Sequence, residues 1–411
     1  DAGIDSIVVD SVFIKPETIP FLQTFKNKIV IGPTDPIKLG NNALSYETFL
    51  ANADFTKTKV RHEKVDSIPD IILYTSGTTA KPKGVMLDEF QFIENSQDTL
   101  IHIPITRDDR VIVALPLFHS FGNIMAMMVF MTGGTLILLK QFAPKSILHN
   151  IEERKATILP LVPTIYSFLI DLYARGDYDV SSLNYCISGG AALPHALLKK
   201  VEETLQVSVI EGYGLTETSP VIAVNTFKDG SFPGSVGPVI PNLKLKIIDE
   251  AGNEKVSGEV GEIVVRGKTV MQGYWNLPKE TAKTITSDGW LKTGDLGHLD
   301  KENRLFISAG RKKDLIIRAG ENISPLAIEN TLMNHPAIAE VAAVGISDER
   351  AGERVKVFIV LRTDATTTES ELKSFCRKNL PAFMVPDHFQ IMEELPKNAT
   401  GKILKNELKK N

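Results

Sequence analysis

The sequence predicts an α/β fold: a large N-terminal domain of helix-covered, largely parallel sheets with a β-rich subdomain, followed by a small α+β C-terminal domain. Three observations carry this prediction. Short apolar, β-branched runs alternate with amphipathic helical patterns through the first three quarters of the chain. From about residue 230 the pattern changes to short strands between Gly and Pro turns. Beyond residue 310, helices and strands form a unit of roughly a hundred residues, the size of a separate domain.

Strands of the large domain are expected where β-branched and other apolar residues run together with little polar interruption. Amphipathic helices are predicted between them at 144–155 and 194–205, and the second has Pro194 in its first turn. The predicted strands of the parallel sheets are 6–10, 28–32, 109–116, 134–139, 156–163, 183–190 and 207–214, and those of the β-rich subdomain are 241–249, 261–267 and 303–308.

The C-terminal unit begins after the basic stretch GRKKD, residues 310–314. Its predicted elements are a Ser-capped helix at 324–336, strands at 338–348 and 353–361, and a capped helix at 368–380. We therefore expect a large domain at 1–310 and a small domain at 311–411.

Composition and charge argue against several classes of protein. The 411 residues are 43% apolar and 23% charged with a formal net charge of −4, so binding to nucleic acid or to an anionic membrane is not expected. The two cysteines cannot form a disulfide framework and fit a reducing compartment, which favours a cytoplasmic protein. The chain begins with Asp1 and shows no secretory signal, so a fragment or a processed form is expected.

One apolar run, residues 122–139, is about as long as a membrane span. Thr132-Gly133-Gly134-Thr135 interrupts it, so we predict a Met-rich helix, a Gly-Gly turn and a buried strand, and not an integral membrane protein. Peripheral membrane association stays open. The helix is predicted to be ordinary core, and the alternative is an apolar channel that its side chains line. Those side chains are Met125, Met127, Met128, Phe130 and Met131.

The stretch YTSGTTAKPKG, residues 74–84, directly follows the apolar run IPDIIL. Glycine N–H groups, hydroxyls and ammonium groups supply donors and positive charge without bulk, which is what a phosphate chain requires. The stretch does not match the pattern G-x-x-x-x-G-K-[ST] of the common phosphate loop. A polar surface loop is the alternative explanation.

Three further stretches carry polar side chains suited to nucleotide chemistry. In GYGLTE, the Tyr213 ring could stack on a purine, the Thr216 hydroxyl could bond a phosphate oxygen, and the Glu217 carboxylate could hold Mg²⁺. Asp295 lies in WLKTGDLG, in a predicted tight turn, and could accept both hydroxyls of a ribose. Lys402 follows a glycine in KNATGKIL. Taken singly, the GYGLTE stretch is better explained by a turn with a core tyrosine and a solvated glutamate. The alternatives for Asp295 and Lys402 are an Asx-turn and one more lysine of a basic tail.

Taken together, the stretches resemble the adenylate-forming superfamily of acyl-CoA synthetases, adenylation domains and luciferases. The superfamily's motifs occur in their usual order along essentially the whole chain; they are YTSGTTAKPKG, YGLTE, TGD, GRKKD and ATGK. PLFHSFG, GENISP and GYWNLPKET are similar to medium- and long-chain fatty-acyl-CoA synthetases. The resemblance implies an AMP-forming acid–thiol ligase that uses ATP and Mg²⁺ to activate a small-molecule carboxylate, here a fatty acid, and transfers the acyl group to coenzyme A.

The resemblance also implies roles for single residues. Lys402 would be the catalytic lysine, Glu217 the metal ligand, Thr216 a contact of the α-phosphate, and His119 a gate beside the substrate carboxylate. Lys313 would be the hinge about which a mobile domain 311–411 turns. The implied nucleotide-binding residues are Thr75, Ser76, Gly77, Thr78, Thr79, Lys81 and Lys83 at the phosphates, Gly189, Gly190, Ala191, Tyr213 and Gly214 around adenine and the acyl group, and Asp295 with Arg311 at the ribose.

Two departures from the superfamily pattern bear on function. The superfamily's N-terminal portion has no counterpart before Asp1, so an N-terminally truncated large domain is expected, and Ala80 stands where the loop usually has Gly. If that position needs positive φ, alanine costs about 1 kcal/mol. Two other functions therefore stay open: a ligase that loads an acyl-carrier protein, and an inactive nucleotide-binding homologue or fragment.

Overall fold

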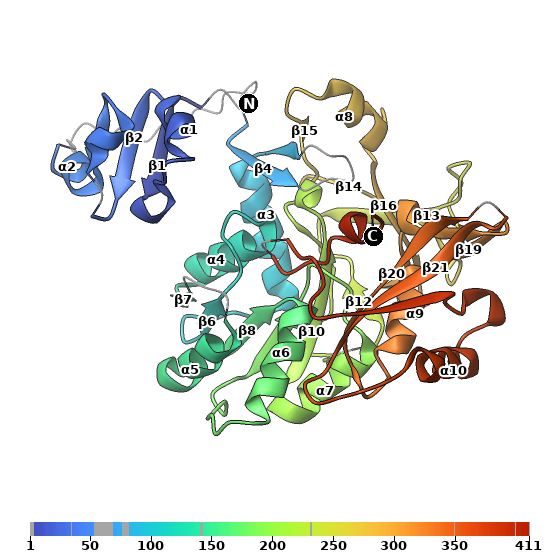
Figure 1. Cartoon of the computed structure of the whole chain (residues 1–411). Helices are drawn as coiled ribbons and strands as arrows, with labels where there is room; N and C mark the ends of the chain where they lie inside the picture. The colour runs from blue at the N-terminus through green and yellow to red at the C-terminus, as the bar shows by residue number, and fades with distance from the viewer. Residues whose placement is uncertain are drawn as a thin grey trace. The chain divides into compact units, whose positions relative to one another are not determined.

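The computed structural model describes residues 4–33, 35–52, 69–75, 82–139, 143–230, 232–348, 350–398 and 400–410, apart from the side chain of Ala309. By its internal contacts the chain divides into two compact units, Asp1–Ile68 and Pro69–Asn411 (Figure 1). This division differs from the predicted boundary near residue 310, which falls inside the second unit and stays a prediction.

The first unit is a small parallel sheet with short helices. Val9, Leu22, Val30 and Leu39 form its apolar core. The strands confirm the two predicted near residues 6–10 and 28–32. Its elements are β1 (Ser6–Asp10), α1 (Ile19–Gln23), β2 (Asn27–Ile31), β3 (Ala43–Ser45) and α2 (Tyr46–Ala51), with the strands in the order β1-β2-β3.

The second unit contains a six-stranded sheet in the order β11-β10-β9-β8-β6-β7, in which only the β10–β11 pair is antiparallel. The predicted parallel sheet is thus confirmed. Its strands are β6 (Arg110–Val113), β7 (Thr135–Leu138), β8 (Ile158–Leu161), β9 (Tyr185–Ser188), β10 (Ser208–Gly214) and β11 (Val221–Val224).

Helices cover both faces of this sheet, which explains why its strands read as continuous apolar runs. Along β6, Val111 and Val113 belong to the core cluster under α3 and α4, whereas Ile112 belongs to the cluster under the other three helices. Those three helices pack against one another on one face (Figure 1). The helices are α3 (Glu89–His102), α4 (Ser120–Thr132), α5 (Pro144–Arg154), α6 (Pro163–Tyr173) and α7 (His195–Leu205).

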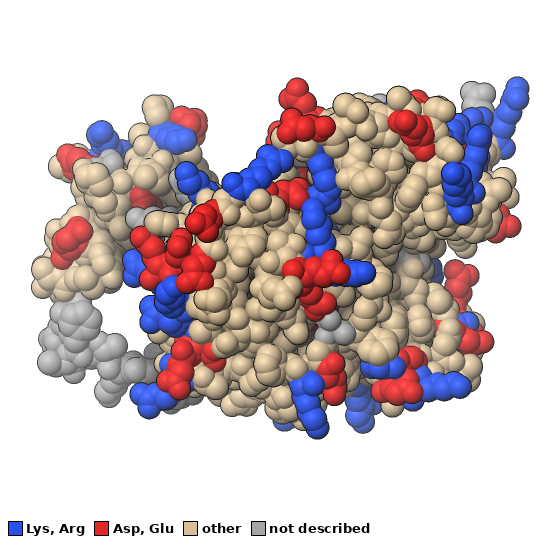
Figure 2. Space-filling view, turned by 90° about the horizontal axis from the view of Figure 1, so that it is seen from below, with Lys and Arg blue, Asp and Glu red and all other residues tan. Residues whose placement is uncertain are grey.

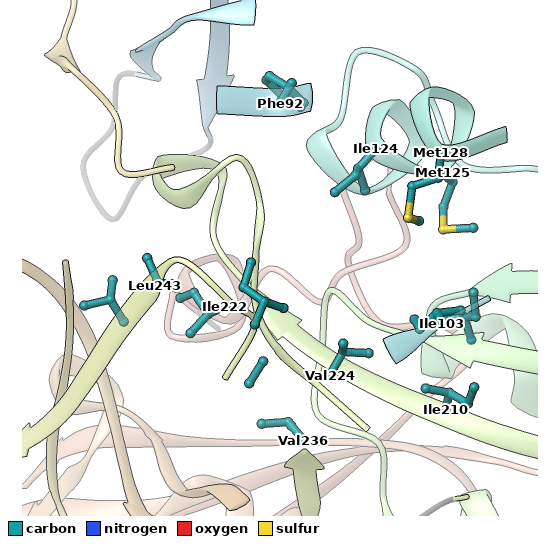
Figure 3. Packing of buried hydrophobic residues seen from close by; sticks show 14 of the residues in the cluster. Phe92, Ile103, Ile124, Met125, Met128, Ile210, Ile222, Val224, Val236 and Leu243 are labelled. Atoms are coloured by element: carbon teal, nitrogen blue, oxygen red, sulfur yellow. The ribbon is translucent and has the colours of Figure 1, made fainter. Parts of the chain in front are cut away.

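The apolar run at 122–139 forms α4, a left-handed Gly133 and β7, as predicted. Met125 and Met128 are each 1% exposed and point from α4 into the core (Figure 3), so the core interpretation is confirmed for these two. Phe130, by contrast, is 68% exposed. Within the described part of the chain, none of the helices has both the length and the apolar character needed to cross a membrane. Acidic and basic side chains are interspersed on the face shown in Figure 2.

Two further sheets of this unit are mainly antiparallel, in agreement with the predicted β-rich subdomain. The hairpin β4–β5 pairs Thr75 with Lys83, so the ends of the YTSGTTAKPKG stretch lie side by side. The three-stranded sheet is β15 (Gly273–Tyr274), β5 (Lys83–Leu87) and β4 (Ile71–Thr75), and the five-stranded sheet runs β12 (Ser235–Pro238), β17 (Arg304–Arg311), β16 (Leu291–Leu299), β14 (Gly261–Gly267) and β13 (Leu243–Ile248).

Residues from Ile316 onward form a separate sheet with their own apolar clusters. The first helix is shorter than predicted, because the chain turns at Met333–His335 and Pro336 follows. Its Ser324 cap and the Thr368–Glu371 capping box of the last long helix are confirmed. The elements are β18 (Ile316–Arg318), β19 (Glu321–Ile323), α9 (Pro325–Leu332), β20 (Ile338–Asp348), β21 (Gly352–Leu361), α10 (Glu369–Asn379), β22 (His388–Met392) and α11 (Lys405–Leu408).

Candidate functional site

Asp295 is the centre of a polar cluster that joins two sheets. It faces Arg311 in the register of β16 and β17, and Arg311 Nε lies 3.2 Å from Asp295 Oδ1. The Tyr213 hydroxyl, at the end of β10 in the other sheet, donates to Asp295 Oδ2 at 2.6 Å. The predicted tight turn at Asp295 is wrong: the residue lies within β16, and the preceding Gly294, with φ of +72°, accounts for the turn-like sequence.

The charges of this cluster stabilise one another. Removal from water opposes the positive charge of Arg311, but the carboxylates of Asp295 and Glu217 outweigh this effect and raise its pKa. Burial and the neighbouring Asp295 charge raise the pKa of Tyr213, so its hydroxyl stays a hydrogen-bond donor. The Asp295 side chain is 8% exposed and therefore keeps a fixed position.

Lys402 is presented by a turn that Asn398 organises. Asn398 Oδ1 accepts hydrogen bonds from the N–H groups of Thr400 and Lys402, at 3.0 and 2.9 Å. Gly401 has φ of +82°, which explains the glycine before the lysine. The Thr164 hydroxyl on α6 donates to the Gly401 carbonyl at 3.1 Å and so holds the turn against the six-stranded sheet.

The Lys402 ammonium group lies near enough to the cluster for their charges to interact. Partial removal from water lowers the pKa of Lys402, the Arg311 charge lowers it further, and Asp295 opposes both. Burial followed by the Lys402 charge lowers the pKa of His119, and desolvation lowers that of Lys313, which Arg311 and Lys402 also influence. The side chain of Lys402 is exposed and therefore keeps contact with solvent.

The YGLTE stretch places Thr216 and Glu217 in a single 3₁₀ turn, Thr216–Thr218, directly after β10. Gly214 allows this turn, because a Cβ there would lie 2.1 Å from the Pro220 carbonyl oxygen. The hydroxyls of Thr216 and Ser120 lie 3.3 Å apart. Ser120 begins α4 next to His119, whose Nδ1 accepts the Phe121 N–H at 3.3 Å.

Glu217 and Lys83 are linked through Tyr274. The Tyr274 hydroxyl donates to Glu217 Oε1 at 2.9 Å, and within the described part of the chain the second carboxylate oxygen is left for a cation. The Lys83 ammonium lies 4.8 Å from the centre of the Tyr274 ring and 3.2 Å from Glu280 Oε2. A single carboxylate suits Mg²⁺, which commonly takes one or two carboxylates together with substrate phosphates.

The SGGA stretch, residues 188–191, begins at the last residue of β9; Ser188 and Gly189 are buried, whereas Gly190 and Ala191 are exposed. A Cβ on Gly189 would lie 3.2 Å from the Phe121 ring, and Gly190 has φ of +79°. Glu211, on β10, accepts the Leu193 N–H at 3.0 Å and fixes the end of this loop. Burial raises the pKa of Glu211 to about 8 although this hydrogen bond opposes the shift.

The structure thus brings together Tyr213, Asp295, Arg311 and Lys402, and it places Thr216 with Glu217 on the adjoining turn. Thr75 and Lys83 border the predicted phosphate loop. The remaining predicted loop residues lie outside the described residues; they are Ser76, Gly77, Thr78, Thr79, Lys81 and the anomalous Ala80.

Several residues of the site had no predicted role. Tyr274 and Glu280 both lie in GYWNLPKET, which the resemblance includes, and Ser120 lies in PLFHSFG. Asn95 carries no such signal, yet it is fully buried and bonds the segment after the YGLTE stretch through Thr218 and Val221. Its partners are more than a hundred residues away in sequence, so no local pattern indicates it.

Family models match most of the chain. The model described as AMP-binding enzyme matches residues 22–275, and the model described as AMP-binding enzyme C-terminal domain matches residues 327–402. The chain belongs to the AMP-binding enzyme family. The predicted adenylate-forming superfamily is therefore confirmed, as is an enzyme of the acid–thiol ligase type.

Proteins similar to this chain differ in their named substrates. The chain is 38% identical to the long-chain-fatty-acid–CoA ligase of Bacillus subtilis, over 98% of this chain and 72% of the relative. It is 34% identical to the sulfoacetate–CoA ligase of Cupriavidus necator, over 82% and 65%. The solved structure of the anthranilate CoA ligase AuaEII, in complex with anthranoyl-AMP, is 27% identical with a TM-score of 0.88 and covers 99% of this chain and 78% of its own.

Proposed function

We propose that the protein activates a carboxylic acid with ATP to an acyl adenylate and then transfers the acyl group to the thiol of coenzyme A. The observation that carries the proposal is the position of Lys402, whose charge acts on His119 and on the cluster of Asp295 and Arg311. A mobile cation beside a fixed carboxylate and a fixed guanidinium suits a reaction in which negative charge develops on a phosphate group.

In the first step, a carboxylate oxygen of the acid attacks the α-phosphorus of ATP, and the bond to the β-phosphate oxygen breaks to release pyrophosphate. Lys402 stabilises the charge that develops on the α-phosphate oxygens, and Thr216 donates a hydrogen bond there. Asp295 accepts the ribose hydroxyls, while Arg311 and Tyr213 hold its carboxylate in place. Lys83 binds the departing phosphates.

Glu217 is the proposed ligand of Mg²⁺, and the Tyr274 hydroxyl orients its carboxylate. When bound, the metal neutralises phosphate charge. The residues fit this role, because among the described residues a hydrogen bond engages only Oε1 of Glu217.

In the second step, the thiol sulfur attacks the acyl carbon, the acyl–phosphate bond breaks, and AMP leaves with the former carboxylate oxygen. Lys402 occupies space next to the adenylate, so the thiol requires a different position of the C-terminal domain. The hinge proposed at Lys313 lies in the 3₁₀ turn Lys312–Asp314 between β17 and β18, where few backbone angles would need to change.

A fatty acid is the proposed substrate class. The support is the relative named as a long-chain-fatty-acid ligase and the absence of charged side chains in α4, residues Ser120–Thr132, which begins beside His119. The relative named for sulfoacetate shows that similar chains take polar acids as well.

The test is ATP–pyrophosphate exchange with a panel of acids: acetate, sulfoacetate, benzoate, and saturated fatty acids of increasing length. We expect exchange that increases with chain length. Exchange with none of the acids would contradict the enzyme function and favour a nucleotide-binding homologue, whereas exchange with only the short or polar acids would contradict the fatty-acid assignment.

The acceptor is tested separately with the acid that supports exchange. Coenzyme A and a pantetheinylated acyl-carrier protein are supplied in parallel, and thioester is quantified. We expect acyl-CoA to form. Acylation of the carrier protein alone would contradict coenzyme A as the acceptor.

A further inference from the structure

Helix α6 presents one stripe of side chains to the C-terminal residues. Thr164, Ser167, Phe168 and Asp171 are spaced i, i+3, i+4 and i+7, so they lie on the same face of the helix. Apolar residues on the opposite face, such as Ile165 and Leu169, belong to the core under the six-stranded sheet. The stripe is therefore a surface that the helix does not need for its own packing.

Each member of the α6 stripe has a partner beyond residue 316. Thr164 donates to the Gly401 carbonyl at 3.1 Å, and Ser167 donates to the Ala339 carbonyl at 3.4 Å. The Lys397 ammonium lies 5.2 Å from the centre of the Phe168 ring. The partners come from β20, from the end of β21 and from the turn that carries Lys402, so one helix face orients the whole C-terminal sheet.

Asp171 supplies the ionic contact of the α6 stripe. Arg362 Nη1 donates to both of its carboxylate oxygens, at 3.0 and 2.8 Å. Lys200, on α7, binds the same carboxylate at 2.9 Å and orients it from the large-domain side. Two cations share one carboxylate, so the group carries an excess positive charge. Loss of the Asp171 charge would leave Arg362 beside Lys200 with no negative charge between them.

The ion pair of Asp171 and Arg362 is partly exposed to water. Asp171 and Arg362 are 28% and 20% exposed, so water can replace each partner when the surfaces separate. A pocket of about 350 Å³ lies beside the pair, lined by Leu197, Lys200, Met333, His335 and Arg362, and keeps the interface incompletely packed. A fully buried apolar interface would instead hold one arrangement permanently.

We propose that the α6 stripe is the docking surface that holds the C-terminal domain where Lys402 reaches the Asp295 cluster, and that Asp171 and Arg362 are positioning residues for the adenylation step. The inference rests on the proposed function. The free energy of these contacts favours the adenylation arrangement and so raises the fraction of molecules that adopt it. The step that uses the thiol requires the domain elsewhere and therefore does not need the pair.

The test compares two half-reactions in the full chain with the substitution Asp171→Asn. We expect ATP–pyrophosphate exchange to fall about tenfold, as the loss of a coupled charge pair predicts, and thioester formation from supplied acyl adenylate to stay unchanged or to rise. Asp171→Glu, which keeps the charge, should retain most of the exchange. Unchanged exchange in Asp171→Asn, or an equal loss in both half-reactions, would overturn the proposal.

Two further variants make the result specific. Asp179→Asn removes an ion pair of similar geometry, with Lys155 at 2.7 Å, that lies within the large domain, and it should alter neither half-reaction. Arg362→Gln removes the same docking contact from the other side and should reproduce the split if Asp171→Asn folds poorly. The docking role would be contradicted if neither Asp171→Asn nor Arg362→Gln lowered exchange more than thioester formation.

A readout that needs no activity separates this proposal from the proposed function. Lys312 and Lys313 are exposed at the junction after Arg311. Undocking should loosen the backbone there, so trypsin should cut several times faster in Asp171→Asn than in the unsubstituted chain or in Asp179→Asn. Equal cleavage rates would overturn the docking role. Absence of exchange in the unsubstituted chain, with faster cleavage of Asp171→Asn, would contradict the proposed function alone.

Discussion

At the scale of single residues, the site depends on groups that orient the functional side chains. Tyr213 and Arg311 hold the two oxygens of Asp295, Tyr274 holds one oxygen of Glu217, and Asn398 shapes the turn before Lys402. A carboxylate that is held in this way loses little freedom when it binds a ligand. The partners are therefore expected to affect catalysis although they do not touch the reacting atoms.

Tyr274→Phe tests this at the metal site. The substitution keeps the ring beside Lys83 and removes the hydroxyl that bonds Glu217, so the Mg²⁺ concentration for half-maximal exchange should rise about tenfold. Tyr185→Phe is the control, because its hydroxyl bonds the Pro104 carbonyl at 2.8 Å and has no part in the site. An unchanged Mg²⁺ requirement in Tyr274→Phe would contradict the role of the tyrosine.

Glu211 predicts a pH dependence of stability. Its pKa of about 8 in the folded protein lies above the ordinary value near 4.5, so the folded state holds a proton that the unfolded state releases. The contribution of this proton to the free energy of unfolding is complete below about pH 4.5 and is lost as the pH rises through about 8. The free energy of unfolding then falls by at most about 1.4 kcal/mol per pH unit.

Glu211→Gln should flatten this slope, because the amide keeps an acceptor for the Leu193 N–H and does not titrate. The urea midpoint of the variant should exceed that of the unsubstituted chain by an amount that grows from about pH 5 to pH 8. If the urea midpoints of the two proteins changed with pH in parallel, Glu211 would be ionised in the folded protein.

At the scale of elements, α3 holds the YGLTE segment in place. Asn95 donates to the carbonyls of Thr218 and Val221, at 3.1 and 2.8 Å, and accepts the Val221 N–H at 3.1 Å. Asn95→Ala leaves these buried groups without partners, at about 1–3 kcal/mol for each group that water cannot reach. Both the thermal midpoint and the exchange rate should fall.

Ser96→Ala is the matched control for Asn95→Ala. Its hydroxyl is also buried but bonds the Phe92 carbonyl within the same helix, so its loss should lower the thermal midpoint slightly and leave exchange unaffected. Exchange that is equally impaired in both variants would show that α3 acts through general stability.

Regular elements and motif positions were predictable from sequence, whereas contacts across the fold were not. The strands of the parallel sheet and the capped helices follow from apolar periodicity and caps, which are local signals. The sequence predicts a turn at Asp295 because Gly294 resembles a turn residue, although pairing with Arg311 of β17 keeps Asp295 in β16. Asn95, Asp171 and Glu211 act through partners that no spacing reveals, so only the fold could identify them.

At the scale of the whole molecule, one turn and one helix face connect the C-terminal residues to the site. Lys402 lies in the turn that Thr164 binds, and Arg362 binds the same helix through Asp171. Separate apolar clusters lie on the two sides of residue 310, so each part would keep its own core in the proposed domain movement. The arrangement described here is the one that we assign to adenylation.

The proposed role of Lys402 is tested by Lys402→Ala in the two half-reactions. ATP–pyrophosphate exchange should fall by at least about a hundredfold, because the variant lacks the charge that stabilises the α-phosphate in the transition state. Thioester formation from supplied acyl adenylate should stay within about twofold, because that step does not use the lysine. Exchange that persists in Lys402→Ala, or an equal loss of both half-reactions, would contradict the assignment.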